Sequence, residues 1–580
     1  MFQRPRYGRT RRCDPPVANV PRLHRSSRTD ARAAGWYRDG EPPGSYVRRL
    51  ERRVDPRYLH FFWFRPRTLL QARNDRLARR ATEMVDNERA RWRAAQRAAG
   101  VEERFPDLVI DRRDLLTPSF LVLGDTGEAD ASQYAVVEPL LAAGADTDFM
   151  VLASDVIYPA GDVNDYVNGF FIPYEDYRAP IYALPGNHDW YALLNGFMYH
   201  FCGAEALPRT DYHPLSYPPA ERRARRKWRQ SSQPRRDLLF AYRRWRDAPH
   251  QPGPYWALDT AAVRLVAIDV GVGDRIDAEQ GAWLEHVSRA PMPKIMLSGK
   301  PIYVNGCYQA GGIAGSGRTI DDVVRDPLHG YVAHIAGDVH NYQRYPVDLG
   351  DGRTIQYIVA GGGGAFMNET HSIAPVALPG VDEEAVRLYP LRGDSLARYS
   401  RVLAPRLRRA VGLLVAAVAL AALFAGGIWM EVRPRWAAAA LEVLPGVVGL
   451  PALVLIAYML ATYGWIVVLG GAIDPADAQR YVGGLLGIEP RRAGSRDRPL
   501  GFVVRRRLRA MLPAAGRERL LFRGKAFSAF FDFDEPPFFK SFLRLDVSAR
   551  SIRVSCFGVT GWRGDETEPA VEDELEIPLV

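Results

Sequence analysis

Three stretches between residues 120 and 190 each begin with an apolar run of about strand length and end in polar residues with turn chemistry. They are residues 120–127, which contain Asp125, residues 149–158, which contain Asp155, and residues 181–189, which contain Asn187 and His188. Such runs predict buried β-strands that end in loops. Side chains of these types at one rim of a sheet supply the oxygen and imidazole ligands that a divalent metal needs.

Strand-like and helical patterns continue to alternate from about residue 115 to residue 366. We expect a hairpin at 254–258 and 263–269, a helix at 278–287, and further buried strands at 294–298, 331–336 and 354–360. This order predicts a layered α/β sandwich with its site at the strand ends. Near the C-terminus, residues 542–547 and 551–559 read as two paired strands, followed by an acidic tail.

Two uncharged apolar runs, residues 410–430 and 446–472, are each long enough to cross a bilayer. The short connection between them indicates a transmembrane hairpin, with a buried hairpin in a soluble core as the alternative. Arginines gather before the first run, so the positive-inside tendency predicts a cytoplasmic catalytic domain on the inner membrane. With two spans, the C-terminal part returns to the same side.

The basic character of the chain is concentrated in patches. The 580 residues carry a formal net charge of +10, with arginine crowded into the first hundred residues and again at 221–229. Such patches favour anionic surfaces or are simply solvated. Residues 68–100 predict a basic amphipathic helix, which either lies on a membrane or packs on the catalytic domain. The first hundred residues lack the interleaved aromatic side chains that stack on bases, so no specific nucleic acid is expected. The four cysteines are scattered, which predicts reduced thiols.

The strand-end stretches resemble the first three motifs of the calcineurin-like metallophosphoesterases. The motifs read Gly124-Asp125-Thr126-Gly127, Asp155-Val156-Ile157-Tyr158 and Gly186-Asn187-His188-Asp189. The Asp-x-Gly and Asp-x-x-Tyr forms are those of the purple acid phosphatase branch. Residues 186–191, 336–342, 361–366 and 525–530 resemble, more closely, a bacterial subgroup of membrane-associated metallophosphoesterases with a C-terminal transmembrane part.

The resemblance implies a fold, a cofactor and roles for named residues. The fold is an αββα sandwich, and the cofactor is a pair of divalent ions of the Mn, Mg or Fe class. Asp155 would bridge the two ions, and His188 would stabilise or protonate the leaving oxygen. The remaining ligands implied are Asp125, Tyr158 and His340 on the first metal, and Asn187 and Asp338 on the second. For Tyr158, simple packing at a strand end is the alternative.

Two positions depart from the family pattern. Gly299 stands where a histidine completes the second metal site, and Asp338 replaces the first histidine of a Gly-His-x-His motif. The second metal therefore faces oxygen ligands only, which favours Mg²⁺ or Mn²⁺ and predicts weak binding. Lys300 is a candidate substrate-binding cation that compensates, or else a surface lysine. The Gly361–364 run either lets amides approach a phosphate or forms a tight turn.

Taken together, the sequence predicts a membrane-anchored hydrolase of a phosphomonoester or phosphodiester, with a lipid-linked substrate as one option. The alternative is a degenerate domain that binds a phosphorylated ligand or partner without turnover. The expected regions are a basic N-terminal region (1–100), the catalytic domain (110–375), the transmembrane hairpin (408–473) and a C-terminal β-rich segment (500–580).

Overall fold

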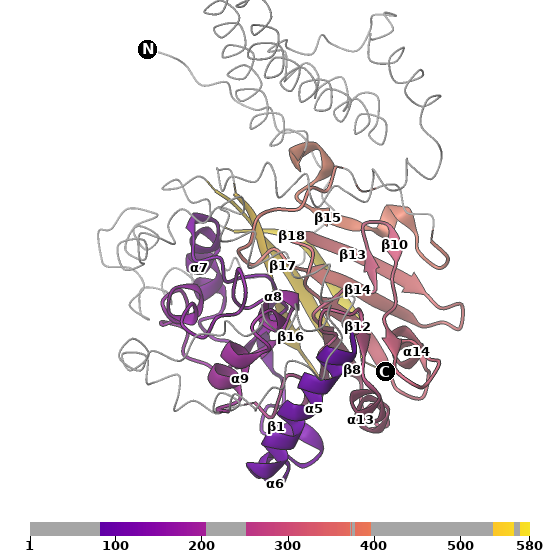
Figure 1. The fold of residues 1–580 in the computed structure, drawn as a ribbon. Coiled ribbons are helices and arrows are strands. Elements are labelled where there is room, and N and C mark those ends of the chain that lie inside the picture. The colour runs from indigo at the N-terminus through magenta and orange to yellow at the C-terminus, as the bar shows by residue number, and fades with distance from the viewer. Residues whose placement is uncertain are drawn as a thin grey trace, which may run out of the picture.

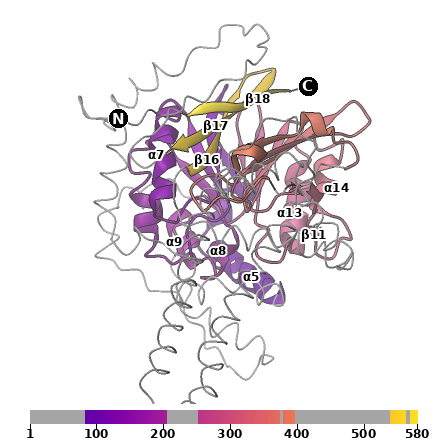
Figure 2. The ribbon, with the colours of Figure 1, turned by 90° about the horizontal axis from the view of Figure 1, so that it is seen from above.

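The computed structural model describes residues 82–204, 251–371, 373, 378–395, 538–561 and 569–579. Two mixed sheets face each other, with helices on both outer sides (Figures 1 and 2). The predicted α/β sandwich is therefore present. The predicted spans at 410–430 and 446–472 lie outside the described residues. Among the residues that the structure describes, no helix is long and apolar enough to cross a bilayer.

The first sheet has six strands and carries all three predicted motif strands. In sheet order these are β18 (Ala570–Pro578), β17 (Ser551–Gly561), β16 (Phe538–Val547), β2 (Ser119–Leu123), β3 (Phe149–Ala153) and β4 (Ile181–Leu184). Strands β2, β3 and β4 are parallel, so their carboxyl ends share one rim. Strand β16 pairs antiparallel with β2, which makes the C-terminal strands part of the catalytic sandwich.

The second sheet has eight strands. In order they are β1 (Val109–Asp111), β5 (Trp256–Asp259), β6 (Arg264–Ile268), β8 (Lys294–Ser298), β12 (Tyr331–Ala336), β14 (Thr354–Ala360), β13 (Tyr342–Asp348) and β15 (Arg387–Tyr389). The predicted hairpin is confirmed as the antiparallel β5–β6 pair. Two short pairs, β9 (Tyr303–Val304) with β10 (Cys307–Tyr308) and β7 (Arg275–Ile276) with β11 (Gly312–Ile313), complete the described strands.

Helices cover the outer faces of both sheets (Figure 2). Helix α7 (Ala131–Ala143) packs on the first sheet, and α13 (Ala278–Ser288) and α14 (Ile320–Arg325) pack on the second. The remaining described helices are α5 (Thr82–Ala98), α6 (Val101–Arg104), α8 (Asn187–Trp190), α9 (Asn195–Phe201) and the short turns η1 (Pro106–Leu108), η2 (Val167–Phe171) and η5 (Glu383–Ala385).

The alternation of side chains along β2 shows how the layers are held together. Phe120 and Val122 point into the core between the sheets, where they meet Trp256 and Ile335 of the second sheet. Successive strand residues face opposite sides, so the residues next to them in β2 belong to the core under α7. Both faces of the motif strands are buried, which explains why they read as continuous apolar runs.

Two parts of the chain refine the sequence expectations. Residues 570–578, expected to be an acidic tail, form the edge strand β18. Residues 82–98, within the predicted basic helix, form α5 and pack on the catalytic domain, with Trp92 buried in the core under α7. For these residues the docking alternative is the correct one. Residues 68–81 lie outside the described part.

Candidate metal centre

The candidate ligands follow the carboxyl ends of β2, β3, β4 and β12, where the two sheets meet. The amide of Gly124 donates to the Ala360 carbonyl of the second sheet, at 2.7 Å. Three of the candidate carboxylates lie on residues with left-handed backbone, namely Asp125 (φ 59°), Asp155 (φ 28°) and Asp338 (φ 68°). Non-glycine residues adopt this conformation at a cost, and such residues cluster at functional sites.

The hydroxyl of Tyr158 is the geometric centre of the first predicted ligand set. It lies 3.2 Å from Asp125 Oδ1, 3.2 Å from Asp155 Oδ2 and 3.2 Å from His340 Nε2. His340 Nε2 is also 3.8 Å from Asp125 Oδ1. All four predicted ligands of the first metal are therefore brought together, and all four side chains are buried.

The imidazole of His340 is held in the orientation that a metal ligand needs. Its Nδ1 lies 2.6 Å from the Phe366 carbonyl oxygen, which can only accept a hydrogen bond. The ring proton therefore belongs on Nδ1, and the Nε2 lone pair points toward the carboxylates. The backbone amide of His340 donates to Asn368 Oδ1 at 2.9 Å, which fixes the loop that carries it.

The electrostatics of the centre call for positive charge. Burial raises the pKa of Asp155, His188 lowers it, and Asp338 raises it, with an upward balance. Burial, Asp155 and Asp125 together raise the pKa of Tyr158. Buried carboxylates that oppose one another's ionisation are stabilised by a bound cation. The donor set thus fits a divalent metal, although no three His, Cys, Asp or Glu side chains form a ready-made metal cage within the described residues.

The third motif brings Asn187 and His188 to the same rim. Asn187 Nδ2 donates to the Tyr191 hydroxyl at 2.9 Å, which leaves the amide oxygen as the available ligand atom. The backbone amide of His188 donates to Asp155 Oδ1 at 2.8 Å. His188 Nδ1 lies 2.8 Å from the Pro159 carbonyl oxygen, which fixes the orientation of the ring.

Sequence reasoning assigned no role to Asp189, which ties the second and third motifs together. Its carboxylate accepts hydrogen bonds from the backbone amides of Val156 (2.9 Å), Ile157 (3.3 Å) and Gly186 (3.0 Å). Burial and the nearby Asp155 raise its pKa. Its place in the Gly-Asn-His-Asp motif was the only signal in the sequence.

Comparison with known proteins identifies the domain. Residues 118–252 match the family model described as calcineurin-like phosphoesterase. The chain carries a calcineurin-like phosphoesterase domain. This match agrees with the superfamily expected from the motifs and supports a phosphoric ester hydrolase. No curated protein matches the sequence.

Several solved structures resemble the chain weakly. GAP50, the anchor in the inner membrane complex of Plasmodium, is 15% identical, with 44% of this chain and 74% of that chain covered and a TM-score of 0.30. Purple acid phosphatase PPD1 from yellow lupin (Lupinus luteus) seeds is 14% identical, with 47% and 48% covered and a TM-score of 0.29. PhoD is 11% identical, with 44% and 59% covered and a TM-score of 0.24. The assignment rests on the family match.

The phosphoesterase domain has no room for a side chain at Gly299. A Cβ built there would lie 2.8 Å from the Pro185 carbonyl oxygen and 3.7 Å from Gly186 Cα. Gly299 therefore packs directly against the third motif loop, at the edge of the centre. A histidine at this position would require the loop to shift, so the backbone packing disfavours an imidazole there.

The side chain of Lys300 is engaged away from the predicted ligands. Its ammonium forms an ion pair with Asp274, and the Lys300 carbonyl accepts a hydrogen bond from Ser298 Oγ at 2.7 Å. Its predicted role in substrate binding stays a prediction, and it requires release from Asp274.

The glycine run of the domain serves as packing for the first motif. Gly363 donates its amide to the Gly124 carbonyl at 3.0 Å, and Ala365 donates to the Asp125 carbonyl at 2.8 Å. A Cβ on Gly361 would lie 2.5 Å from Asp125 Oδ2. From the other side, the Ser541 amide in β16 donates to the Gly362 carbonyl at 2.9 Å. The glycine run therefore packs behind Asp125, between the first motif and β16, and a role toward a phosphate stays a prediction.

Proposed function

We propose that this chain is a membrane-anchored phosphoesterase that hydrolyses a phosphomonoester or phosphodiester at a dinuclear metal site. The observation that carries the proposal is the convergence of Asp125, Asp155 and His340 on the Tyr158 hydroxyl, at 3.2 Å each. Oxygen and imidazole donors directed at one buried point are the donor set of a hydrolytic metal centre.

The residues divide into two ligand sets that share Asp155. The tighter metal would be held by Asp125, Asp155, Tyr158 and His340, because these four side chains lie together at one rim of the sandwich. Asn187 and Asp338 would hold the second metal and bind it more weakly, because Gly299 supplies no ligand. When bound, the two ions supply an acidified water and neutralise phosphate charge.

His188 is the residue best placed to act on the leaving group. Its backbone is fixed to Asp155 and its Nδ1 to the Pro159 carbonyl. The ring also packs on Tyr158, with centroids 4.5 Å apart. A fixed imidazole beside the predicted bridging carboxylate can donate a hydrogen bond or a proton to a leaving oxygen.

The position of the C-terminal strands supports the proposed anchor. Strand β15 ends at Tyr389 and β16 begins at Phe538, and both belong to the same sandwich. A chain that crosses the membrane between these strands has to come back to the side on which the sandwich lies. This requires an even number of spans. The two apolar runs at 410–430 and 446–472 satisfy this requirement. The arginines before the first run favour a cytoplasmic domain at the inner membrane, by the positive-inside tendency.

The test is hydrolysis of one phosphomonoester reporter and one phosphodiester reporter by the purified chain, titrated with Mn²⁺. Asp155→Asn removes the predicted bridge. Asp351→Asn, the same change at an exposed turn carboxylate paired with Arg353, is the matched control. We expect activity that rises with Mn²⁺, survives in the control and disappears in Asp155→Asn.

The outcomes separate the two functions that the sequence allows. The ratio of the two reporter rates sets the substrate class, and vesicles with anionic phospholipid test a lipid-linked substrate. No turnover at any Mn²⁺ concentration, with one equivalent of metal still bound, would overturn the hydrolase and favour binding of a phosphorylated ligand.

A further inference from the structure

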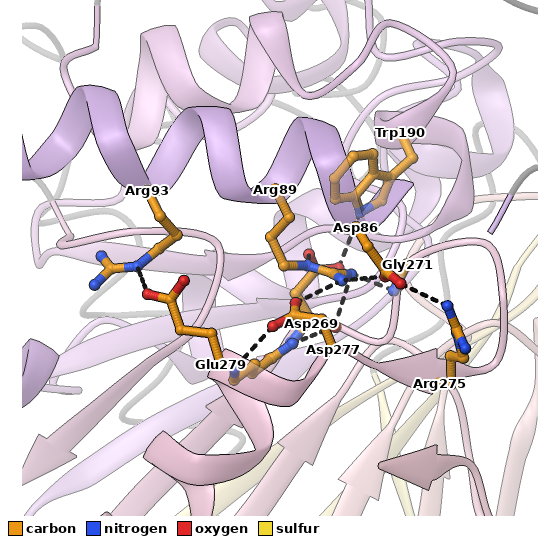
Figure 3. A network of polar contacts seen from close by, with 10 residues as sticks. Asp86, Arg89, Arg93, Trp190, Asp269, Gly271, Arg275, Asp277 and Glu279 are labelled. Carbon is orange, nitrogen blue, oxygen red and sulfur yellow. Dashed lines mark hydrogen bonds and ion pairs between the residues drawn. The ribbon is translucent and has the colours of Figure 1, made fainter. Parts of the chain in front are cut away.

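Helix α5 precedes the phosphoesterase domain and packs against the third motif. That motif forms the short helix α8, which carries Asn187 and His188. Two side chains of α5 reach α8 and the turn after it, as Figure 3 shows for Arg89 beside Trp190. These two side chains are Arg89 and Trp92.

Arg89 is linked to Trp190 by a shared carboxylate. Arg89 is only 1% exposed, and its Nε donates to Asp269 Oδ2 at 2.9 Å. The other oxygen of Asp269 accepts from Trp190 Nε1, also at 2.9 Å. The guanidinium carbon lies 5.2 Å from the Trp190 ring centroid, within cation–π range. Trp190 is the last residue of α8.

Several carboxylates surround the guanidinium of Arg89. A second carboxylate, Asp277, lies 2.9 Å from Arg89 Nη1 at the N-cap of α13. Burial lowers the pKa of Arg89, but Asp269 and Asp277 raise it above its ordinary value. The Asp269 amide in turn donates to Gln280 Oε1 at 2.8 Å, so the carboxylate is fixed to the second sheet and to α13.

Trp92 holds the chain directly after α8. Its Nε1 donates to the Leu193 carbonyl at 2.9 Å. Leu193 and Leu194 both have left-handed backbone, with φ of 58° and 59°. Two consecutive non-glycine residues with left-handed backbone are strained. The hydrogen bond from Trp92 of α5 helps to keep this turn in place.

We propose that α5 is a positioning element for the second metal ligand: Arg89 and Trp92 fix α8 so that Asn187 and His188 face Asp155. The inference rests on the proposed function. Neither residue is a catalytic residue, because each acts through Trp190 or Leu193. Partners that orient metal ligands commonly contribute on the order of 10-fold or more to metal affinity.

The test measures Mn²⁺ binding by isothermal titration calorimetry, with reporter hydrolysis recorded in parallel on the full chain. Arg89→Met keeps the side-chain length but removes the link to Asp269. Trp92→Phe keeps an aromatic ring but removes the donor to Leu193 together with part of the buried indole, and it serves where Arg89→Met folds poorly. Arg93→Met is the matched control, since Arg93 is also a buried arginine of α5 but pairs with Glu102 and Glu279.

We expect two Mn²⁺ sites in the wild-type chain. Arg89→Met and Trp92→Phe should raise the Kd of the weaker site by about 10-fold and leave the tighter site unchanged. Arg93→Met should leave both sites unchanged. The KM for the reporter should move less than kcat, because neither substitution removes a group that the proposed function assigns to the substrate.

Three results would overturn the inference: an unchanged weaker site in both variants, equal weakening of both sites together with a lower Tm, or a single site in the wild type. Failure of the proposed function is distinguishable from these. A wild-type chain that binds two Mn²⁺ but hydrolyses neither reporter would refute the hydrolase, while the binding curves would still decide the role of α5.

Discussion

Gly186→Ala adds one methyl group beside Asp155 and tests how closely the third motif loop packs against this carboxylate. A Cβ at this position would lie 2.1 Å from Asp155 Oδ1 and 2.3 Å from the Asp155 amide nitrogen. Ordinary contact begins at about 3.4 Å. The loop or the carboxylate therefore has to move by about 3.4 − 2.1 = 1.3 Å.

Neither neighbour can move cheaply. Asp155 Oδ1 accepts the His188 amide at 2.8 Å, and the Gly186 amide is held by Asp189 at 3.0 Å. Overpacking of this kind costs about 1–3 kcal/mol of unfolding free energy. A displacement of about 1 Å in a reacting group costs on the order of 100-fold in rate. We expect both effects in Gly186→Ala.

The matched control is Gly312→Ala in β11, where a Cβ would meet nothing within 4 Å. The assay is kcat/KM for the better phosphoester reporter at saturating Mn²⁺, with thermal unfolding recorded beside it. A Gly186→Ala chain with the activity and Mn²⁺ dependence of Gly312→Ala would refute the reasoning, since Asp155 would then not depend on this packing.

Three further changes probe other parts of the molecule. Tyr158→Phe removes the central hydroxyl and should raise the Mn²⁺ concentration for half-maximal activity on the order of 10-fold; no change would mean that the ring only packs. Burial lowers the pKa of His334 from 6.5 to about 3. Below pH 6.5 the imidazole is therefore protonated in the unfolded chain but not in the folded chain, and the free energy of unfolding falls as the pH drops from 6.5 toward 3. His334 should account for roughly 1.4 kcal/mol of the loss between pH 7.5 and pH 5.5, and the loss should be smaller by that amount in His334→Gln, as urea unfolding at the two pH values can check. Asp573→Asn should cost about 3 kcal/mol in the same assay at pH 7.5, because it leaves the buried Arg344 without its carboxylate; a loss no larger than that in Asp351→Asn would show that the pair contributes little.

The sequence could place the candidate ligands at one rim because they follow the ends of β2, β3, β4 and β12. An apolar run that stops at Asp125 or Asp155 is a local signal, and parallel pairing of β2 with β3 then places the two residues side by side. The Tyr158 geometry agrees with this expectation. The ion pair of Lys300 has no local signal in the sequence, because its partner Asp274 lies in a different loop.

Strand β18 was missed because one of its inward positions is charged. Asp573 is buried, and Arg344 of the other sheet neutralises it, with Nε and Oδ2 2.6 Å apart. The hydroxyl of Tyr342 donates to the same carboxylate at 2.7 Å. Without knowledge of these partners, more than 200 residues away, the acidic sequence reads as a solvated tail. The docking of α5 was left open for the same reason, since Arg89 and Asp269 are 180 residues apart.

The pairing of β16 with β2 also governs the order of events during synthesis. Ser119 and Asp546, which are hydrogen-bonded partners in these strands, are 427 positions apart. At about 5–20 residues per second, a ribosome needs roughly 20–90 s to add the chain between them. During that time β2 has one edge without its final partner, and an unpaired apolar edge is a template for aggregation. The loop behind Asp125 likewise gains its support from β16 only after residues 396–537 have been made. Competence for metal binding should thus arise late, after the intervening segment has left the ribosome.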